Sequence, residues 1–266
     1  MIRRLTEKDR ETVLAYAGKR PAENLFIIGD IEAFGFNSDV VTVWGDFDQN
    51  GALASIMLRY RENYIPYAED PERLDGEAWG RILRQDSRMN MVSGIEEYAA
   101  GILPFAGRSV KSRKVCYYAR RPLGRPVNRE LSGMEVKMLF PEEADRIIAL
   151  RREIAEFTGT TDERPEVLRE NMEKGISRTF YIEKNDEPVS AVSTTAETGQ
   201  AAMIIGVCTR KDWEHRGLAT KCLTKLIGVL QAEHKEPCLF YTNPAAGRIY
   251  KKLGFIDIGK WMMAGF

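Results

Sequence analysis

Apolar and polar positions follow two different periods along the second half of the chain. Between Leu218 and about His234, apolar residues recur every three or four positions, which predicts a half-buried helix. Residues 201–209 and 238–242, on either side of this helix, are short apolar runs typical of buried strands. Residues 179–184 and 188–195 alternate in polarity and predict a hairpin. The pattern therefore predicts strands and helices that alternate around one sheet.

The first half repeats much of this order, which indicates an ancient duplication. Its elements are expected to be strands at 2–5, 40–47, 52–60, 89–92 and 114–120 and helices after Thr6, from about Pro21 to Gly35, at 71–84 and at 95–103. Residues 136–139 then start a new strand followed by an acidic helix start, as residues 2–9 do. Two prolines, a glycine and three arginines within 120–126 predict a connection between two domains, 1–128 and 129–266.

One junction in the second half carries a candidate for chemistry. The apolar strand that ends at Thr209 is followed by a charged loop and then by Arg216-Gly217-Leu218-Ala219, which opens the long helix. The first turn of a helix leaves backbone N–H groups without intrahelical partners and is mildly positive. A glycine there lets the backbone approach a ligand closely. The junction is a candidate phosphate or pyrophosphate site, although plain packing of a strand on a helix gives the same pattern.

The segments around and after this junction carry a family resemblance. Val207-x-Thr209 and the RGLA segment precede Asn243-Pro-Ala-Ala-x-x-Ile-Tyr-x-Lys-Leu-Gly-Phe255. This order over residues 131–266 resembles the GNAT superfamily of acetyl-CoA-dependent N-acetyltransferases, above all its glycine N-acyltransferase-like branch. The resemblance implies an α+β fold of tandem GNAT-like units, each with a mixed central sheet flanked by helices. It also implies a catalytic domain at 129–266 and a degenerate one at 1–128, which lacks the RGLA junction.

The resemblance implies acetyl-CoA as the co-substrate and assigns residues to it. The backbone of the strand end would hold the pantetheine arm, and the backbone N–H groups of the junction would hold the pyrophosphate. The residues implied are Val207, Cys208, Thr209, His215, Arg216, Gly217, Leu218, Ala219 and Thr220. Glu214 departs from the family, which commonly has Arg or Gln at that position, and a carboxylate aimed at a pyrophosphate would repel it.

Acetyl transfer needs a donor for the departing thiolate and an acceptor for the amine's proton. Tyr250 matches the position of the family's general acid, and its hydroxyl stays protonated at neutral pH. Asn243 matches a residue near the thiol of the cofactor, and it is also a good N-cap before Pro244. The preferred candidate for the base that accepts the amine's proton is Glu197, and the alternatives are Glu153, Glu156 and a water relay.

The amino-acid composition limits the kinds of partner that we expect the protein to bind. Lys and Arg together number 39, as do Asp and Glu, so no net charge favours nucleic acid or an anionic membrane. Four cysteines without a Cys-x-x-Cys pair and two histidines argue against a metal site. No apolar run has membrane-spanning length, and the arginines near the start are not followed by the apolar segment of a signal peptide. These features predict a cytoplasmic two-domain monomer or homodimer with neither a nucleic-acid nor a membrane partner.

The sequence therefore predicts an enzyme that moves acetyl from acetyl-CoA directly to a primary amine of a small molecule or peptide. Two alternatives stay open at this point. One is an acyl-CoA-binding sensor without catalysis, in which Tyr250 is structural. The other is a transferase that uses a different acyl donor on the same fold, because function depends on the site rather than on the scaffold.

Overall fold

The computed structural model describes residues 1–36, 38–126, 133–157 and 164–266, which form two compact units. The first contains 1–119, 240–242 and 257–266, and the second contains 120–239 and 243–256. The C-terminal strand thus belongs to the first unit. The predicted boundary at 128 falls outside the described residues and stays a prediction.

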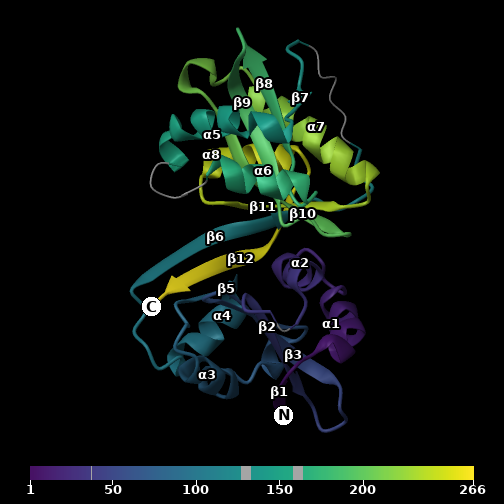
Figure 1. Ribbon diagram of the computed structural model, residues 1–266, viewed down its shortest axis with the longest axis vertical. Helices are drawn as coiled ribbons and strands as arrows, with labels where there is room; N and C mark the ends of the chain where they lie inside the picture. Colours follow the sequence, from purple (N-terminus) through teal and green to yellow (C-terminus); the bar gives the residue numbers. More distant parts are fainter. Residues whose placement is uncertain (37, 127–132, 158–163) are drawn as a thin grey trace. The chain divides into compact units, whose positions relative to one another are not determined.

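Both halves of the chain have the same order of helices and strands (Figure 1). The first half contains β1 (Ile2–Arg4), α1 (Arg10–Ala17), α2 (Leu25–Phe34), β2 (Val41–Phe47), β3 (Leu53–Tyr60), β4 (Asn63–Ala68), α3 (Gly76–Gln85), β5 (Met91–Ile95), α4 (Glu96–Ile102) and β6 (Ser112–Arg120). The second contains β7 (Lys137–Met138), α5 (Ala144–Arg152), α6 (Pro165–Glu173), β8 (Thr179–Lys184), β9 (Glu187–Thr195), β10 (Ala201–Thr209), α7 (Leu218–Ala232), β11 (Glu236–Tyr241), α8 (Pro244–Lys252) and β12 (Ile256–Gly265). The repeat confirms the predicted tandem α+β fold.

The strands of the first unit form a mixed sheet in the order β1-β2-β3-β4-β5-β12-β6. Strand β4 is parallel to β5, whereas β12 is antiparallel to β5, from Trp261↔Ile95 to Gly265↔Met91. Strand β4 was not expected from the sequence, because Pro66 interrupts the ladder hydrogen bonding typical of a strand. The predicted helix at 71–84 is also shorter, since a 3-10 turn at Pro71–Arg73 precedes α3.

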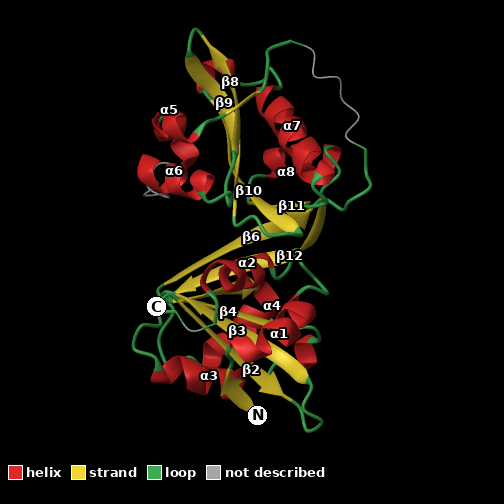
Figure 2. Cartoon of the chain, turned by 45° about the vertical axis from the view of Figure 1, so that its right-hand side comes forward, coloured by secondary structure: helices red, strands yellow, loops and turns green. Residues whose placement is uncertain are grey.

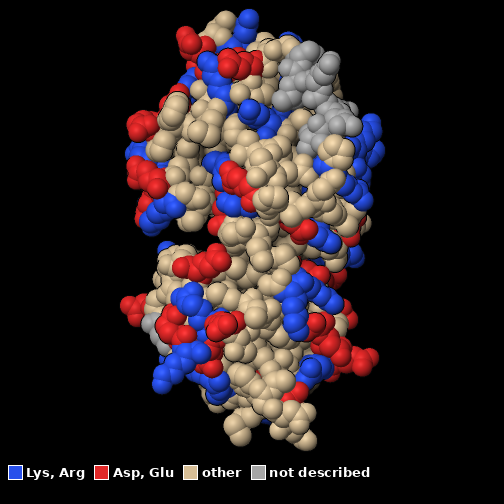
Figure 3. Space-filling model, turned by 90° about the vertical axis from the view of Figure 1, so that its right-hand side faces the viewer, with Lys and Arg blue, Asp and Glu red and all other residues tan. Residues whose placement is uncertain are grey.

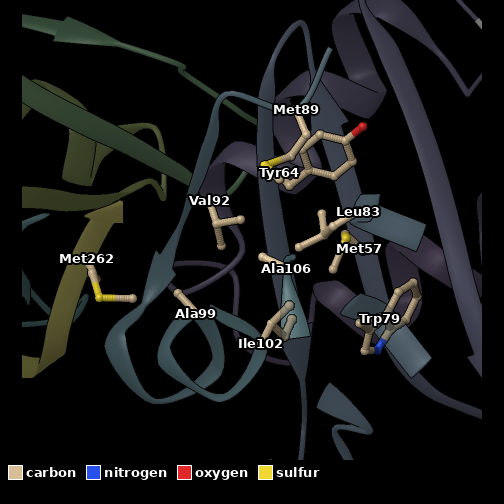
Figure 4. Packing of buried hydrophobic residues seen from close by; sticks show 10 residues of the cluster. All are labelled: Met57, Tyr64, Trp79, Leu83, Met89, Val92, Ala99, Ile102, Ala106 and Met262. Carbon is tan, nitrogen blue, oxygen red and sulfur yellow. The ribbon is translucent and has the colours of Figure 1, made fainter. Parts of the chain in front are cut away.

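The core of the first unit packs α3 and α4 onto the sheet (Figure 4). Trp79 is fully buried and its indole N–H donates to Ser55 Oγ at 3.1 Å, so its polar atom is satisfied. The buried side chains are Met57, Tyr64, Trp79, Leu83, Met89, Val92, Ala99, Ile102, Ala106 and Met262. Met262 comes from the C-terminal strand, so the end of the chain helps to complete this core.

The strands of the second unit are ordered β11-β10-β9-β8-β7, with β10 parallel to β11 and the other pairs antiparallel. Figure 2 shows α5 and α6 on one face of these strands and α7 and α8 on the other. As predicted, α7 buries Leu218, Cys222, Leu223, Leu226, Ile227 and Leu230. Each buried Leu or Ile contributes about 1.5–3 kcal/mol, which fixes the position of α7 on the sheet.

The chain contains acidic and basic side chains in equal number, 39 of each. Figure 3 shows the two kinds interspersed over the face it displays. In the described part of the chain, no helix has the length and apolar character needed to cross a bilayer.

Candidate functional site

Strand β10 loses its parallel partner halfway along its length. Pairing with β11 runs from Ala201↔Glu236 to Ile204↔Leu239, while β10 itself continues to Thr209. On its other edge, β10 stays paired with β9 up to Thr209↔Ser190. Among the described residues, no strand pairs with the β11-facing edge of β10 after Ile204. The backbone groups of this edge, around Val207 and Thr209, are therefore accessible to an extended ligand that binds as a strand does.

A glycine marks the point where β10 departs from β11. The register of β10 against β9 shifts between Ile205 and Cys208, and Gly206 within this bulge has a φ of +60°. Arg151 of α5 is 5 % exposed, and its guanidinium packs against Gly206. A Cβ at Gly206 would lie 2.8 Å from Cζ of Arg151. Nη2 of Arg151 also donates to Ser193 Oγ at 2.6 Å, so one buried arginine supports both the bulge and β9.

The helix after β10 begins without a side-chain cap. Gly217 is the N-cap of α7, with a φ of +76° in the left-handed region, and no side-chain cap is found among the residues that the structure describes. The preceding His215 is also left-handed, with a φ of +61°. These two conformations turn the chain sharply into α7, whose first N–H groups have no intrahelical acceptor. Residues 214–217 are exposed, so this helix start is accessible to an anion.

The charged side chains in the loop between β10 and α7 make different contacts. The Arg216 guanidinium stacks on Trp213 at 4.4 Å from the ring centroid, and its Nη2 donates to the Asp212 carbonyl at 3.1 Å. Arg210 pairs with Glu187 at 2.9 Å, as expected of a solvated surface arginine. Glu214 is exposed. Arg216 is therefore the guanidinium fixed next to the open helix start.

The other predicted contacts are Asn243, which follows β11, and Tyr250, which lies in α8. Asn243 caps α8, because its Oδ1 accepts from the Ala245 N–H at 2.8 Å. Tyr250 is 7 % exposed and packs edge-on against Phe255 at 6.0 Å between ring centroids. Because β10 and β11 are parallel, their carboxyl ends meet at one edge of the sheet. The strand end at Val207–Thr209, the α7 start and Asn243 thus each follow the carboxyl end of one of these two strands.

The Cys208 side chain faces away from this edge. It is 5 % exposed and packs in the core under α5 and α6 with Leu139 and Ala191. Only its backbone can contribute to a ligand at the open strand edge. The helical Cys222 is also buried, and burial raises the pKa of its thiol to about 12. Neither thiol is arranged as a nucleophile, because the thiolate is the reactive form.

Glu197 is not brought together with the other predicted residues. It precedes Ala201, the first residue of β10, and so lies at the opposite end of that strand. Arg178 donates to both of its carboxylate oxygens, at 2.8 and 2.6 Å, and Lys235 donates at 2.9 Å. Burial alone would raise the pKa of Glu197, but hydrogen bonds from Arg178, Thr194 and Lys235 lower it below its usual value. A carboxylate held in this way fits an ion-pair role better than that of a proton acceptor.

In the first half of the chain, the helix start that corresponds to the α7 start has a different N-cap. Helix α3 follows β4 as α7 follows β10, and its N-cap is Asp75. The Asp75 carboxylate accepts from the Ala78 N–H at 2.9 Å, and Glu77 adds a negative charge to the first turn. The Asp75 carboxylate already accepts from this helix start, and a phosphate there would be repelled by both Asp75 and Glu77.

Sequence reasoning missed Arg151, Ser193 and Gly206. One signal was present for Gly206, because a glycine inside an apolar strand often marks a bulge. No local pattern connects Arg151 with β10, since the two are far apart in the sequence. Of the other base candidates, the side chain of Glu156 lies outside the described residues. No group of three or more His, Cys, Asp or Glu residues able to hold a metal occurs among those described.

Comparisons with known proteins identify a family domain in the second half of the chain. Residues 172–263 match the model of the GNAT acetyltransferase family. No curated protein matches the chain. A GCN5-related N-acetyltransferase from Sphaerobacter thermophilus is similar in structure, with a TM-score of 0.65 and 14% identity over 99% of this chain and 94% of that one.

Two other solved structures are similar over the whole length. A Drosophila protein has a TM-score of 0.67 at 12% identity, over 100% of this chain and 98% of that one. A tandem GNAT protein from the clavulanic acid biosynthesis pathway has a TM-score of 0.56 at 15% identity, over 99% of this chain and 97% of that one. At these identities the likeness concerns the fold, and it agrees with two GNAT-like units in tandem. The glycine N-acyltransferase-like branch stays a prediction.

Proposed function

We propose that the chain, whose residues 172–263 match the GNAT acetyltransferase family, transfers an acetyl group from acetyl-CoA to a primary amine. The observation that carries the proposal is the uncapped start of α7 next to the unpaired edge of β10. An uncapped helix start favours a pyrophosphate, and an unpaired strand edge favours the amide groups of a pantetheine arm. The two lie one loop apart in the chain.

The predicted cofactor residues divide the binding of acetyl-CoA among them. Backbone groups of Val207 and Thr209 hold the pantetheine arm, with Cys208 contributing only main-chain atoms. The backbone N–H groups from His215 to Thr220 bind the pyrophosphate, helped by the Arg216 guanidinium. Asn243 contacts the arm close to its thiol while it also caps α8. Bound acetyl-CoA supplies a thioester carbonyl that an amine nitrogen can attack.

The transfer requires two proton movements, for which the chain offers one donor. The Tyr250 hydroxyl gives its proton to the departing thiolate sulfur. The attacking nitrogen loses a proton to water. Glu197 is not given this role, because its carboxylate is paired with Arg178 and Lys235. The bond from the carbonyl carbon to nitrogen forms as its bond to sulfur breaks. No enzyme-bound acyl group is needed, which agrees with the buried state of Cys208 and Cys222.

The first experiment is a melting curve of the full chain with and without acetyl-CoA. A ligand at about a hundred times its dissociation constant adds roughly 2.7 kcal/mol to the free energy of unfolding, which raises the melting temperature. Thiol release is then followed colorimetrically over a panel of primary amines. An upward shift together with amine-dependent thiol release supports the proposal. A shift without release for any amine favours the sensor, and the absence of a shift contradicts the proposal.

A further inference from the structure

A carboxylate without a counter-charge lies on α2 in the first unit. Asp30 is half-buried, and among the described residues it has neither a hydrogen-bond partner nor an ion-pair partner. Burial raises the pKa of this carboxyl group to about 7, and no neighbouring charge or donor lowers it again. Uncompensated burial of a carboxylate is costly, so folded proteins normally provide it with a partner. A positively charged group is the kind of partner that would compensate the ionised form.

An aromatic cluster lies one helical turn from Asp30. Phe26 precedes it by four residues and therefore projects from the same side of α2. The Phe26 ring lies 5.3 Å from Trp261 and 6.1 Å from Phe240, measured between ring centroids. Tyr118 completes the cluster at 4.8 Å from Phe240. All these residues belong to the first unit.

Two rings of the cluster are buried and two are half-buried. Trp261 and Tyr118 are 3 % and 0 % exposed, whereas Phe26 and Phe240 are half-buried. The buried Tyr118 also holds α2 in position, because its hydroxyl donates to the Ala22 carbonyl just before the helix. Figure 1 shows α2 beside β12, the strand that carries Trp261. Asp30 thus lies one helical turn from Phe26, whose ring contacts Phe240.

We propose that Asp30, Phe26 and Phe240 form a binding site for the ammonium group of a small organic amine. A carboxylate supplies the counter-charge, and the faces of the two phenyl rings attract a cation through their quadrupoles. Such an arrangement recognises a protonated or quaternary ammonium group and not the uncharged alcohol of the same shape. The site lies within the first unit and is independent of the groups that we assign to acetyl-CoA.

The test measures binding of n-butylammonium, tetramethylammonium and 1-butanol to the full chain by calorimetry at pH 8, where Asp30 is ionised. We expect both cations to bind and the alcohol not to bind. Asp30→Asn and Phe26→Leu should each weaken cation binding at least tenfold. Glu32→Gln is the matched control, since it removes a carboxylate from the exposed side of the same helix, and it should leave cation binding unchanged.

Three results would overturn the proposal: no cation binding by the natural chain, equal binding of the alcohol, or unchanged cation binding in Asp30→Asn. Unfolding curves of each variant, together with acetyl-CoA titrations, show whether the variants are folded. If Phe26→Leu fails to fold, Asp30→Asn alone decides, because an amide replaces the carboxylate without a change of shape. Acetyl-CoA binding reports separately on the proposed transferase, so failure of the amine site leaves that result unaffected.

Discussion

Asp75 and Gly217 hold the same position in the two repeats, each being the N-cap of the helix after the fourth strand of its half. Asp75 satisfies its helix with its own carboxylate, whereas Gly217 leaves the corresponding groups open. The two repeats therefore differ at this N-cap, where the first presents a carboxylate and the second has no side chain. This difference is the basis of the proposal that the second half binds acetyl-CoA and the first does not.

Gly217→Asp should therefore transfer the property of Asp75 to the second half. The new carboxylate would repel the pyrophosphate and compete for the N–H groups of α7, so we expect acetyl-CoA affinity to fall at least tenfold. Titration calorimetry measures the affinity directly. Gly217→Asn tests for side-chain bulk and strain at a φ of +76°, since Asn tolerates this region without a charge. As a control, Gly199→Asp adds the same charge at an exposed turn and should leave acetyl-CoA affinity unchanged. If Gly217→Asp binds acetyl-CoA as tightly as the natural chain, the predicted pyrophosphate site is contradicted.

Gly206→Ala should disrupt the bulge of β10. The added Cβ would meet the Arg151 guanidinium and would also occupy a left-handed backbone conformation. Strain and overpacking together should lower the free energy of unfolding by about 2–4 kcal/mol, measured by urea denaturation. Gly228→Ala is the control, because nothing lies within 4 Å of a Cβ at that position of α7. It should instead raise stability by about 0.5–1 kcal/mol. Equal effects of the two variants would show that Arg151 does not constrain the bulge.

Glu197→Gln should reduce stability without acting on transfer. Removing this charge leaves Arg178 and Lys235 with the more exposed Glu233 as their remaining carboxylate partner, which should cost about 1–3 kcal/mol. Urea denaturation and the turnover number per folded molecule separate the two roles. Glu233→Gln removes a more exposed partner of Arg178 and should cost about 1 kcal/mol or less. A large loss of turnover in folded Glu197→Gln would instead support its predicted role as the base.

Tyr250→Phe addresses the proposed acid. The ring and its packing on Phe255 are kept while the hydroxyl is removed. If the hydroxyl protonates the departing thiolate, kcat should fall about 100-fold and the dissociation constant of acetyl-CoA should stay within twofold. Steady-state thiol release and calorimetry give the two values. An unchanged kcat would mean that Tyr250 is a packing residue only.

Asp30 should make stability depend on pH between about 4 and 7. Its pKa is about 7 in the folded chain and near 4 in an unfolded one, so the folded state binds the extra proton in this window. The free energy of unfolding therefore falls as pH rises from 4 to 7 because of this group. Asp30→Asn should be more stable than the natural chain by about 1–2 kcal/mol at pH 8, after allowance for the solvent contact of Asp30. At pH 4 the two should be equal, and a pH-independent difference in urea unfolding would contradict the assignment.

Features that depend on neighbouring residues could be predicted from the sequence. The apolar period of α7, the hairpin of β8 and β9, the glycine start at Gly217 and the cap at Asn243 are all local, and all are found in the structure. The repeat order also comes from local patterns, apart from β4, where Pro66 weakened the strand signal. Turn and periodicity signals act within a few residues, so one chain read in order is enough to detect them.

Tertiary packing, in contrast, determines which distant groups meet. It pairs the final strand with β5, so the end of the chain completes the core of the first unit. It packs Arg151 on Gly206, surrounds Glu197 with Arg178 and Lys235, and half-buries Asp30. Burial, ion pairing and packing are properties of the three-dimensional neighbourhood. They depend on contacts between residues far apart in the chain, and local propensity carries no record of them.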